Sequence, residues 1–299
     1  MLRALVGPTA SGKTDAGIAL ATRSGVEIAS VDSMLVYRGM DVGTAKPTAD
    51  QQRALPHHLM DLAEPSERFS VARYQQAAHD LLDRVPDPLL VGGSGLYFRA
   101  VVDRLRFPPE DPAVRASLEA EADVLGADEL YERLSAADPV AAARIDPANV
   151  RRTIRALEVS TITGAPFSDF ADAWEVYDPA LVRVAGIRLA SATLDARVRA
   201  RVARMLETGW IDEVRDLMER GFGAWLTASQ AIGYAELAAH LDGRLALDEA
   251  MERTVKRTKE LARRQMAWFR RDPRVRWFDA GEDGAVAVVD EVAAYLGAA

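Results

Sequence analysis

A loop that could bind phosphate groups lies near the start of the sequence, directly after the mostly apolar run 2–6. It reads GPTASGKT and consists of Gly7, Pro8, Thr9, Ala10, Ser11, Gly12, Lys13 and Thr14. Gly7 and Gly12 allow a tight turn whose backbone N–H groups point at one anion, and a helix beginning near Lys13 would add its positive dipole end. In such loops the lysine contacts the outer phosphate and the last hydroxyl, here Thr14, contacts Mg²⁺. The loop predicts a phosphate-containing ligand with Mg²⁺ as cofactor.

A carboxylate that could act together with this loop follows the second expected strand, at Asp32. Ligands of open α/β sheets bind at the carboxyl ends of the strands, so Asp32 should face the phosphate loop. Asp32 could hold Mg²⁺, accept a proton from an incoming nucleophile, or cap the turn that begins at Asp32-Ser33. The spacing alone leaves these three roles open. It also leaves open whether the phosphate is transferred, hydrolysed or released as a leaving group.

The order of the expected elements predicts a parallel sheet. In the first part of the chain, strands are expected at 2–6, 27–31, 58–62 and 89–91, and helices at 13–22, 70–83 and 96–102. Short apolar strands that alternate with helices form parallel sheets with crossover connections. In the last part we expect a strand at 182–189, one long helix at 194–220, a basic helix at 250–270, and a strand at 275–278 before a closing helix.

The texture of the sequence changes near Phe107-Pro108-Pro109. From there to about Ser168 the chain is rich in Ala, Glu, Arg and Leu, with helix breaks at Gly126, Pro139 and Pro147. We therefore expect an α/β fold, with a P-loop-type parallel sheet flanked by helices and a mostly helical insertion domain. The expected core comprises residues 1–108 and 182–299, and the expected insertion comprises residues 109–181.

The composition sets limits on function. No run approaches the roughly 20 apolar residues that cross a bilayer, so no membrane partner is expected. The chain has no cysteine, which excludes disulfides and thiolate metal sites, and no secretory signal is recognised, so a cytoplasmic location is expected. His57 and His58 are adjacent, and neighbouring strand residues point to opposite faces, which argues against a transition-metal site. The net charge of −8 argues mildly against nucleic acid, yet residues 253–276 hold ten Lys or Arg and only two acidic residues.

The sequence after Asp32 resembles a known family. Residues 32–47, DSMLVYRGMDVGTAKP, are similar to the second motif of the bacterial tRNA dimethylallyltransferases, also called tRNA isopentenyltransferases. Further similar motifs follow in the family's order at residues 56–61, 92–97, 155–158, 231–234 and 264–270. The resemblance implies transfer of a dimethylallyl group from dimethylallyl diphosphate to N6 of adenosine 37 in tRNA. The phosphate would then be the leaving group.

The resemblance also implies roles for individual residues. Asp32 would accept the proton from N6, Lys13 would stabilise the departing diphosphate, and Ser94, where the family commonly has threonine, would contact the substrate near the amine. Arg197 and Arg201 would bind the diphosphate together with the loop, although exposed ion pairing is an alternative for them.

The same resemblance implies contacts with the anticodon stem-loop of a tRNA. These are expected from Asp32, Ser33, Met34, Leu35, Ser94, Arg151, Arg152, Thr153, Ile154 and Arg155. Many relatives carry glutamine where this chain has Leu35, and a leucine side chain cannot hydrogen-bond a base edge. The alternative for 151–155 is a solvated helix face with Arg155 in an ion pair. We expect a monomer.

Other interpretations remain open at this stage. A small-molecule or nucleotide kinase would use the same loop, with Asp32 as a metal ligand, and a nucleotide-regulated RNA-binding module would use it without catalysis. The basic helix could follow an RNA backbone or form a solvated face, and we favour RNA contact. Trp268 and Phe269 are expected in the core.

Overall fold

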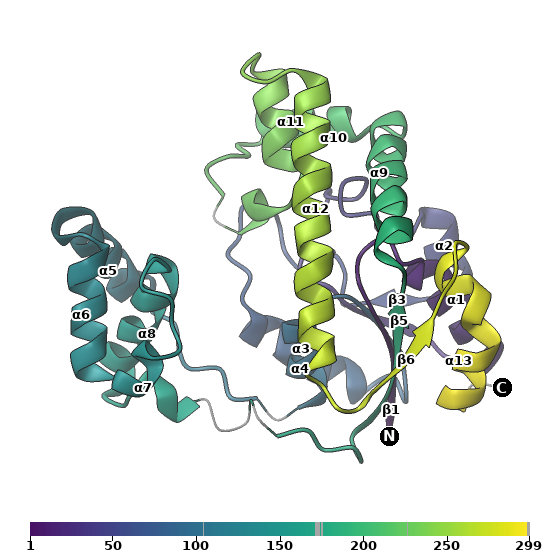
Figure 1. Cartoon of the computed structure of the whole chain (residues 1–299), viewed down its shortest axis with the longest axis horizontal. Coiled ribbons are helices and arrows are strands. Elements are labelled where there is room, and N and C mark those ends of the chain that lie inside the picture. The colour runs from purple at the N-terminus through teal and green to yellow at the C-terminus, as the bar shows by residue number, and fades with distance from the viewer. Residues whose placement is uncertain (104, 171–173, 175, 226, 298–299) are drawn as a thin grey trace. The chain divides into compact units, whose positions relative to one another are not determined.

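The computed structural model describes residues 1–103, 105–170, 174, 176–225 and 227–297 (Figure 1). The chain divides into two compact units, residues 1–103 with 177–299, and residues 104–176. We call them the sheet unit and the insertion unit. The boundaries expected from the sequence, after residue 108 and before residue 182, lie a few residues later than those of the structure. The difference arises because the chain leaves the sheet unit directly after the helix that ends at Val102.

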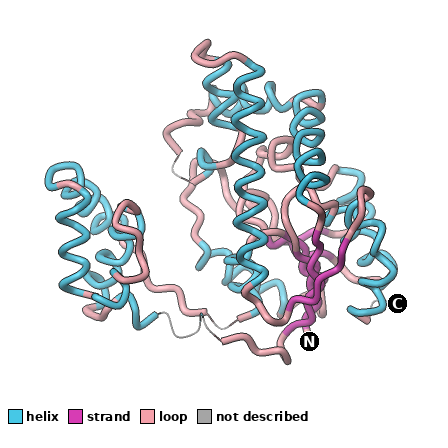
Figure 2. Tube along the Cα trace, viewed as in Figure 1, coloured by secondary structure: helices cyan, strands magenta, loops and turns pink. Residues whose placement is uncertain are grey.

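The sheet unit is built on a six-stranded parallel sheet with the order β3-β2-β4-β1-β5-β6, drawn in magenta in Figure 2. Its strands are β1 (Leu2–Val6), β2 (Ile28–Val31), β3 (His57–His58), β4 (Leu89–Gly92), β5 (Val182–Arg188) and β6 (Val275–Asp279). Val6 pairs with Gly92, and Gly92 pairs with Val31. The segments that follow β1, β2 and β4 therefore begin at the same edge of the sheet, where ligands of such sheets bind. The predicted α/β fold with a parallel sheet is confirmed.

Helices cover the sheet on both faces (Figure 1). The helices of this unit are α1 (Lys13–Ser24), α2 (Ala49–Ala54), α3 (Val71–Leu82), α4 (Gly95–Val102), α9 (Ser191–Glu207), α10 (Trp210–Glu219), α11 (Tyr234–Leu241), α12 (Leu247–Arg270) and α13 (Val289–Leu296). Leu20 of α1 and Val292 of α13 share one apolar core with Leu5 and Ile187 of the sheet. On α3, the buried Tyr74 hydroxyl donates to the carbonyl oxygen of Ser30 at 2.5 Å. Among the described helices, none combines the length and hydrophobicity needed to cross a bilayer.

Two expected elements differ from the structure. The strand expected at 58–62 is the short β3, because Leu59 and Asp61 have positive φ angles of 62° and 54°, which an extended strand does not allow. The single helix expected at 194–220 is two helices, α9 and α10. They are separated at Gly209, whose φ of 98° no right-handed helix contains.

The insertion unit is helical. It contains α5 (Pro112–Leu125), α6 (Ala127–Ala137), α7 (Pro139–Ala142) and α8 (Val150–Thr163). The breaks expected at Gly126 and Pro139 separate α5 from α6 and α6 from α7. Apolar side chains of all four helices form its own core, including Leu118, Leu134 and Ile154.

Candidate active site

The predicted phosphate loop lies between β1 and α1. Gly7 leaves the strand so close to β5 that a Cβ atom there would stand 2.9 Å from the carbonyl oxygen of Ile187. Gly12, the residue before α1, has a φ of 85°, which favours glycine. Since the first N–H groups of a helix have no partner inside the helix, the start of α1 is free to bind an anion.

A glutamine from the far end of the chain fixes the middle of this loop. The Thr9 N–H donates a hydrogen bond of 2.7 Å to Oε1 of Gln265, a buried residue of α12. The amide of Gln265 also lies against Gly93, where a Cβ atom would approach Nε2 to 2.5 Å. Gln265 therefore connects the phosphate loop to the segment after β4. It lies within the matching motif 264–270, but nothing in the sequence assigned it this role.

The basic side chains of the site surround the loop. The Lys13 ammonium donates to the Pro8 carbonyl oxygen at 2.6 Å. Burial and the nearby Arg201 lower the pKa of Lys13 to about 7, although the Asp32 carboxylate opposes this. Burial likewise lowers the pKa of Arg201 from its usual value, and Asp32 again opposes the shift. Nε of Arg197 donates to the Ala10 carbonyl oxygen at 2.9 Å.

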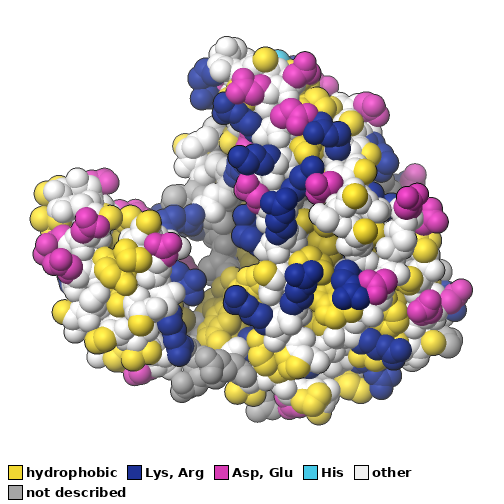
Figure 3. All heavy atoms as spheres, viewed as in Figure 1, with side chains coloured by type: hydrophobic (Ala, Val, Ile, Leu, Met, Phe, Trp, Pro, Cys, Tyr) yellow, Lys and Arg dark blue, Asp and Glu magenta, His cyan; other side chains and the backbone are white. Residues whose placement is uncertain are grey.

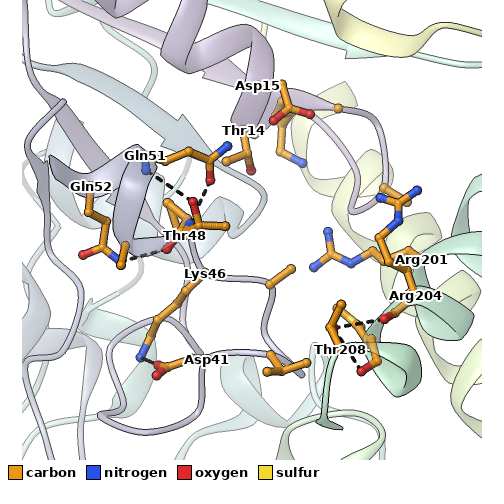
Figure 4. A pocket seen from close by; sticks show the side chains of 18 of the residues that line it. Thr14, Asp15, Asp41, Lys46, Thr48, Gln51, Gln52, Arg201, Arg204 and Thr208 are labelled. Atoms are coloured by element: carbon orange, nitrogen blue, oxygen red, sulfur yellow. Dashed lines mark hydrogen bonds and ion pairs between the residues drawn. The ribbon is translucent and has the colours of Figure 1, made fainter. Parts of the chain in front are cut away.

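These groups line a cavity of about 710 Å³ within the sheet unit (Figure 4). Its walls come from the phosphate loop, the start of α1, the segment 41–52, Asp61 and one face of α9. Six of the residues predicted to bind diphosphate line it: Ala10, Gly12, Lys13, Thr14, Arg197 and Arg201. Gly7, Pro8, Thr9 and Ser11 belong to the same loop but not to this wall.

Two further cations in the wall were not singled out from the sequence. Lys46 is almost fully buried and is neutralised, since its ammonium lies 2.6 Å from carboxylate oxygens of both Asp41 and Asp61. Arg204 follows Arg201 by almost one turn of α9 and is exposed in the cavity. Because Lys46 is paired with two carboxylates, the cations of the wall that remain for a ligand are Lys13 and the arginines of α9, and this group suits a polyanion.

Asp32 directly follows β2, and Ser94 lies two residues after the end of the neighbouring strand β4. Oδ1 of Asp32 accepts the Met34 N–H at 2.8 Å, so capping of the turn, one of the three roles left open for this residue, is present. The Ser94 N–H donates to the carbonyl oxygen of Val31 at 3.2 Å, and its hydroxyl caps α4. Asp32 does not line the 710 Å³ cavity, but its charge acts on both Lys13 and Arg201.

The segments predicted to contact tRNA differ in exposure. Residues 32–35 are partly exposed. In the insertion unit, Arg151 and Arg152 are exposed, whereas Thr153 and Ile154 are buried and face the core of that unit. Arg155 pairs with Glu158 at 2.8 Å, which confirms the ion pair given as the alternative for this residue.

The structure also shows the contacts or exposure of the two histidines, of two aromatic residues and of the basic helix that the sequence analysis considered. The His58 imidazole lies 2.6 Å from Glu27, and Nδ1 of His57 lies 2.7 Å from the Leu55 carbonyl oxygen. Phe269 is 1% exposed, as expected for the core, but the core assignment of Trp268 was wrong, because this side chain is 41% exposed. Lys and Arg side chains gather along α12 on the face shown in Figure 3.

Known proteins are similar to this chain over nearly its whole length. The IPP transferase family matches residues 35–272, and the isopentenyl transferase family matches residues 1–62. The tRNA dimethylallyltransferase of Kineococcus radiotolerans is 50% identical over 290 residues, covering 93% of this chain and 90% of that protein. The chain belongs to the IPP transferase family.

Another relative and a solved structure support the same family assignment. The tRNA dimethylallyltransferase of Desulforudis audaxviator is 46% identical over 285 residues, covering 94% of this chain and 92% of that protein. The crystal structure of the tRNA isopentenylpyrophosphate transferase from Bacillus halodurans is 40% identical, with a TM-score of 0.70 over 99% of this chain and 95% of that one. The family predicted from the motifs is confirmed, and the chain is an enzyme of the tRNA dimethylallyltransferase type.

Proposed function

We propose that this enzyme transfers the dimethylallyl group of dimethylallyl diphosphate to N6 of adenosine 37 in tRNA and releases diphosphate. The observation that carries the proposal is the relation between the segments that follow β1 and β2, two strands that end at the same edge of the sheet with β4 between them. A cationic cavity built on the loop after β1 lies near the Asp32 carboxylate after β2, whose charge acts on Lys13 and Arg201. The cavity can hold a polyanion, and the carboxylate of Asp32 can accept a proton.

The donor's diphosphate fits the loop and the arginines of α9. The loop offers backbone N–H groups, and Lys13, Arg197 and Arg201 offer positive charge. These donors would stabilise the negative charge that develops on the departing diphosphate, and removal of one such donor typically slows a reaction by about 10²–10³.

Two residues in the first turn of α1 could bind Mg²⁺. Thr14 and Asp15 line the cavity and offer a hydroxyl and a carboxylate. Among the described residues, no group of three or more His, Asp or Glu could hold a metal ion by itself. The Thr14 hydroxyl and the Asp15 carboxylate suit Mg²⁺, which usually takes one or two protein ligands and completes its shell with water and substrate phosphates. Bound there, it would neutralise charge on the diphosphate oxygens.

The acceptor side depends on Asp32. The adenine N6 amine is a poor nucleophile because its lone pair is delocalised into the ring, so its attack benefits from a proton acceptor. In the proposed step the N6–carbon bond forms, the carbon–oxygen bond to diphosphate breaks, and the electron pair leaves with the diphosphate. The proton of N6 passes to the carboxylate of Asp32. Ser94, at the next strand end, would contact the substrate beside the amine.

The tRNA would be bound through its anticodon stem-loop. A base in a loop can be turned out of the stack at a cost of a few kcal/mol, which makes N6 reachable. Exposed arginines at the start of α8, Arg151 and Arg152, and the basic surface along α12 (Figure 3) suit a phosphate backbone. We propose further that the enzyme acts as a monomer in the cytoplasm.

One experiment separates this function from a kinase. Purified protein is incubated with Mg²⁺, unmodified tRNA and either dimethylallyl diphosphate or ATP, and the nucleosides are then analysed. We expect N6-dimethylallyladenosine only with the prenyl donor. Phosphate transfer from ATP without any prenylated nucleoside would contradict the proposal and favour the kinase.

A further inference from the structure

A second carboxylate, Glu213 of α10, lies behind the cavity wall and accepts four hydrogen bonds. Its Oε2 accepts the N–H groups of Asp41 and Val42, both at 2.7 Å. Its Oε1 accepts the Gly43 N–H at 3.0 Å and the Tyr234 hydroxyl at 2.7 Å. Three successive backbone amides of one loop therefore converge on one side chain from a helix more than a hundred residues away.

The loop 41–43 also packs tightly against α10. A Cβ atom at Gly43 would stand 2.0 Å from Nε1 of Trp210, one turn before Glu213. The same indole packs against Gly233, at the start of α11, where a Cβ atom would stand 2.0 Å from its ring. Trp210 and Tyr234 are both fully buried. The loop is thus seated directly on the two helices, and Glu213 fixes its backbone.

This loop leads into the cavity. The next residue, Thr44, accepts a hydrogen bond of 3.2 Å from Nη2 of Arg201 through its carbonyl oxygen. Asp41, Val42 and Lys46 line the same cavity. A shift of the loop would therefore move the Thr44 carbonyl, and with it the acceptor that holds the Arg201 guanidinium.

We propose that Glu213 is a positioning residue for diphosphate binding, acting through the loop 41–44 on Arg201. This inference rests on the proposed function, because it takes Arg201 as a ligand of the donor's diphosphate. The carboxylate is needed for its acceptor capacity, since two oxygens with about four lone-pair sites can serve four donors. Glutamine has one acceptor oxygen and would turn its own N–H₂ donors toward the donors of the loop or of Tyr234. The loop would then be released or shifted.

The test compares Glu213→Gln with Glu219→Gln, which alters an exposed carboxylate at the end of the same helix. Binding of inorganic pyrophosphate is measured by titration calorimetry with Mg²⁺, and steady-state kinetics are measured for both substrates. We expect Glu213→Gln to weaken pyrophosphate binding about tenfold and to raise KM for the prenyl donor by a similar factor. KM for tRNA should stay near that of the wild type, and Glu219→Gln should match the wild type in every respect.

A double-mutant cycle tests the route through Arg201. If Glu213 acts by orienting this guanidinium, Arg201→Met and the double variant should bind pyrophosphate equally weakly, because the second change removes nothing more. Additive losses would overturn the inference. If Glu213→Gln does not fold, Glu213→Asp, which keeps the charge but shortens the reach, takes its place in the cycle.

The two proposals can fail separately. Wild-type protein that prenylates tRNA, together with a Glu213→Gln variant that binds pyrophosphate as tightly as the wild type, would overturn the role of Glu213 alone. Wild-type protein that binds no pyrophosphate and forms no prenylated nucleoside would overturn the proposed function, and the role of Glu213 with it.

Discussion

The Lys13 ammonium is turned back onto its own loop, where it donates a hydrogen bond of 2.6 Å to the carbonyl oxygen of Pro8. Burial and the charge of Arg201 lower the pKa of this lysine to about 7. In the protein without ligand, Lys13 therefore changes its charge near neutral pH. A bound diphosphate favours the charged form, so anion binding and proton uptake are coupled.

This coupling predicts how pyrophosphate affinity depends on pH. Below about pH 7 Lys13 is already protonated and contributes its full charge. Above that pH the free protein must take up a proton on binding, so the contribution of Lys13 to affinity should fall by up to about tenfold per pH unit. The measurement is the affinity ratio of wild type to Lys13→Met between pH 6 and 9, which cancels the titration of pyrophosphate itself. A ratio that stays constant across this range would contradict the prediction.

The proposed proton acceptor can be removed without removing the turn. In Asp32→Asn the amide oxygen can still accept the Met34 N–H, which now lies 2.8 Å from Oδ1. Asparagine cannot take the proton of N6, so kcat should fall by about 10²–10⁴ while tRNA affinity stays near normal. Single-turnover rates and filter binding measure these two quantities. Asp80→Asn, on the exposed face of α3, is the matched control. Turnover that survives in Asp32→Asn would rule out this residue as the base.

Local chemistry explains which elements could be predicted from the sequence. The glycine spacing of the phosphate loop and the apolar run before it are contiguous, and β1 and α1 begin where they were expected. The prediction of one long helix was wrong because the pattern of apolar residues continues across Gly209. The left-handed backbone of this single glycine ends the helical region and separates α9 from α10. Arg155 shows the limit of charge patterns, since its guanidinium donates to the carbonyl oxygens of Pro108 and Pro109 and pairs with Glu158.

The parts of the site that could not be predicted are contacts between distant segments. Glu213 and the amides of 41–43, like Gln265 and the Thr9 N–H, meet only after the sheet and its helices have packed. A backbone amide carries no sequence signature, so its partner cannot be inferred from residue types. The resemblance marked the motif that contains Gln265 but could not say which atom it binds.

The contact between Gln265 and Thr9 can be tested by removing the acceptor. Gln265→Leu keeps a buried side chain of similar size but leaves the Thr9 N–H without its partner. Because Thr9 is partly exposed, the expected loss is the net value of one hydrogen bond, so the free energy of unfolding should fall by about 0.5–1.5 kcal/mol. KM for the prenyl donor should rise as well, because Thr9 belongs to the phosphate loop. Met266→Leu, at the neighbouring buried position, should cost less than about 1.5 kcal/mol and leave KM unchanged.

A cluster of buried charges lies where the chain leaves the sheet unit and returns to it. Nη1 of Arg274 donates to Asp103 at 2.6 Å, and Nη2 donates to Asp272 at 2.7 Å. Arg99 joins the cluster by pairing with Asp103 at 2.5 Å, and its guanidinium lies 4.4 Å from the centre of the Tyr177 ring. Along the chain, Asp103 is the last residue of the sheet unit before the insertion unit, and Tyr177 is the first residue after it. The cluster thus anchors both chain crossings.

Loss of Arg274 should be costly because two buried carboxylates would lose a shared partner. For Arg274→Met we expect the free energy of unfolding to fall by about 3–5 kcal/mol, measured by urea denaturation. Adding Asp272→Asn to this variant removes one of the stranded charges and should restore part of the loss. Arg271→Met, which alters an exposed arginine directly after α12, should have little effect. An equal loss in Arg274→Met with and without Asp272→Asn would show that the cost comes from lost packing and not from unpaired charge.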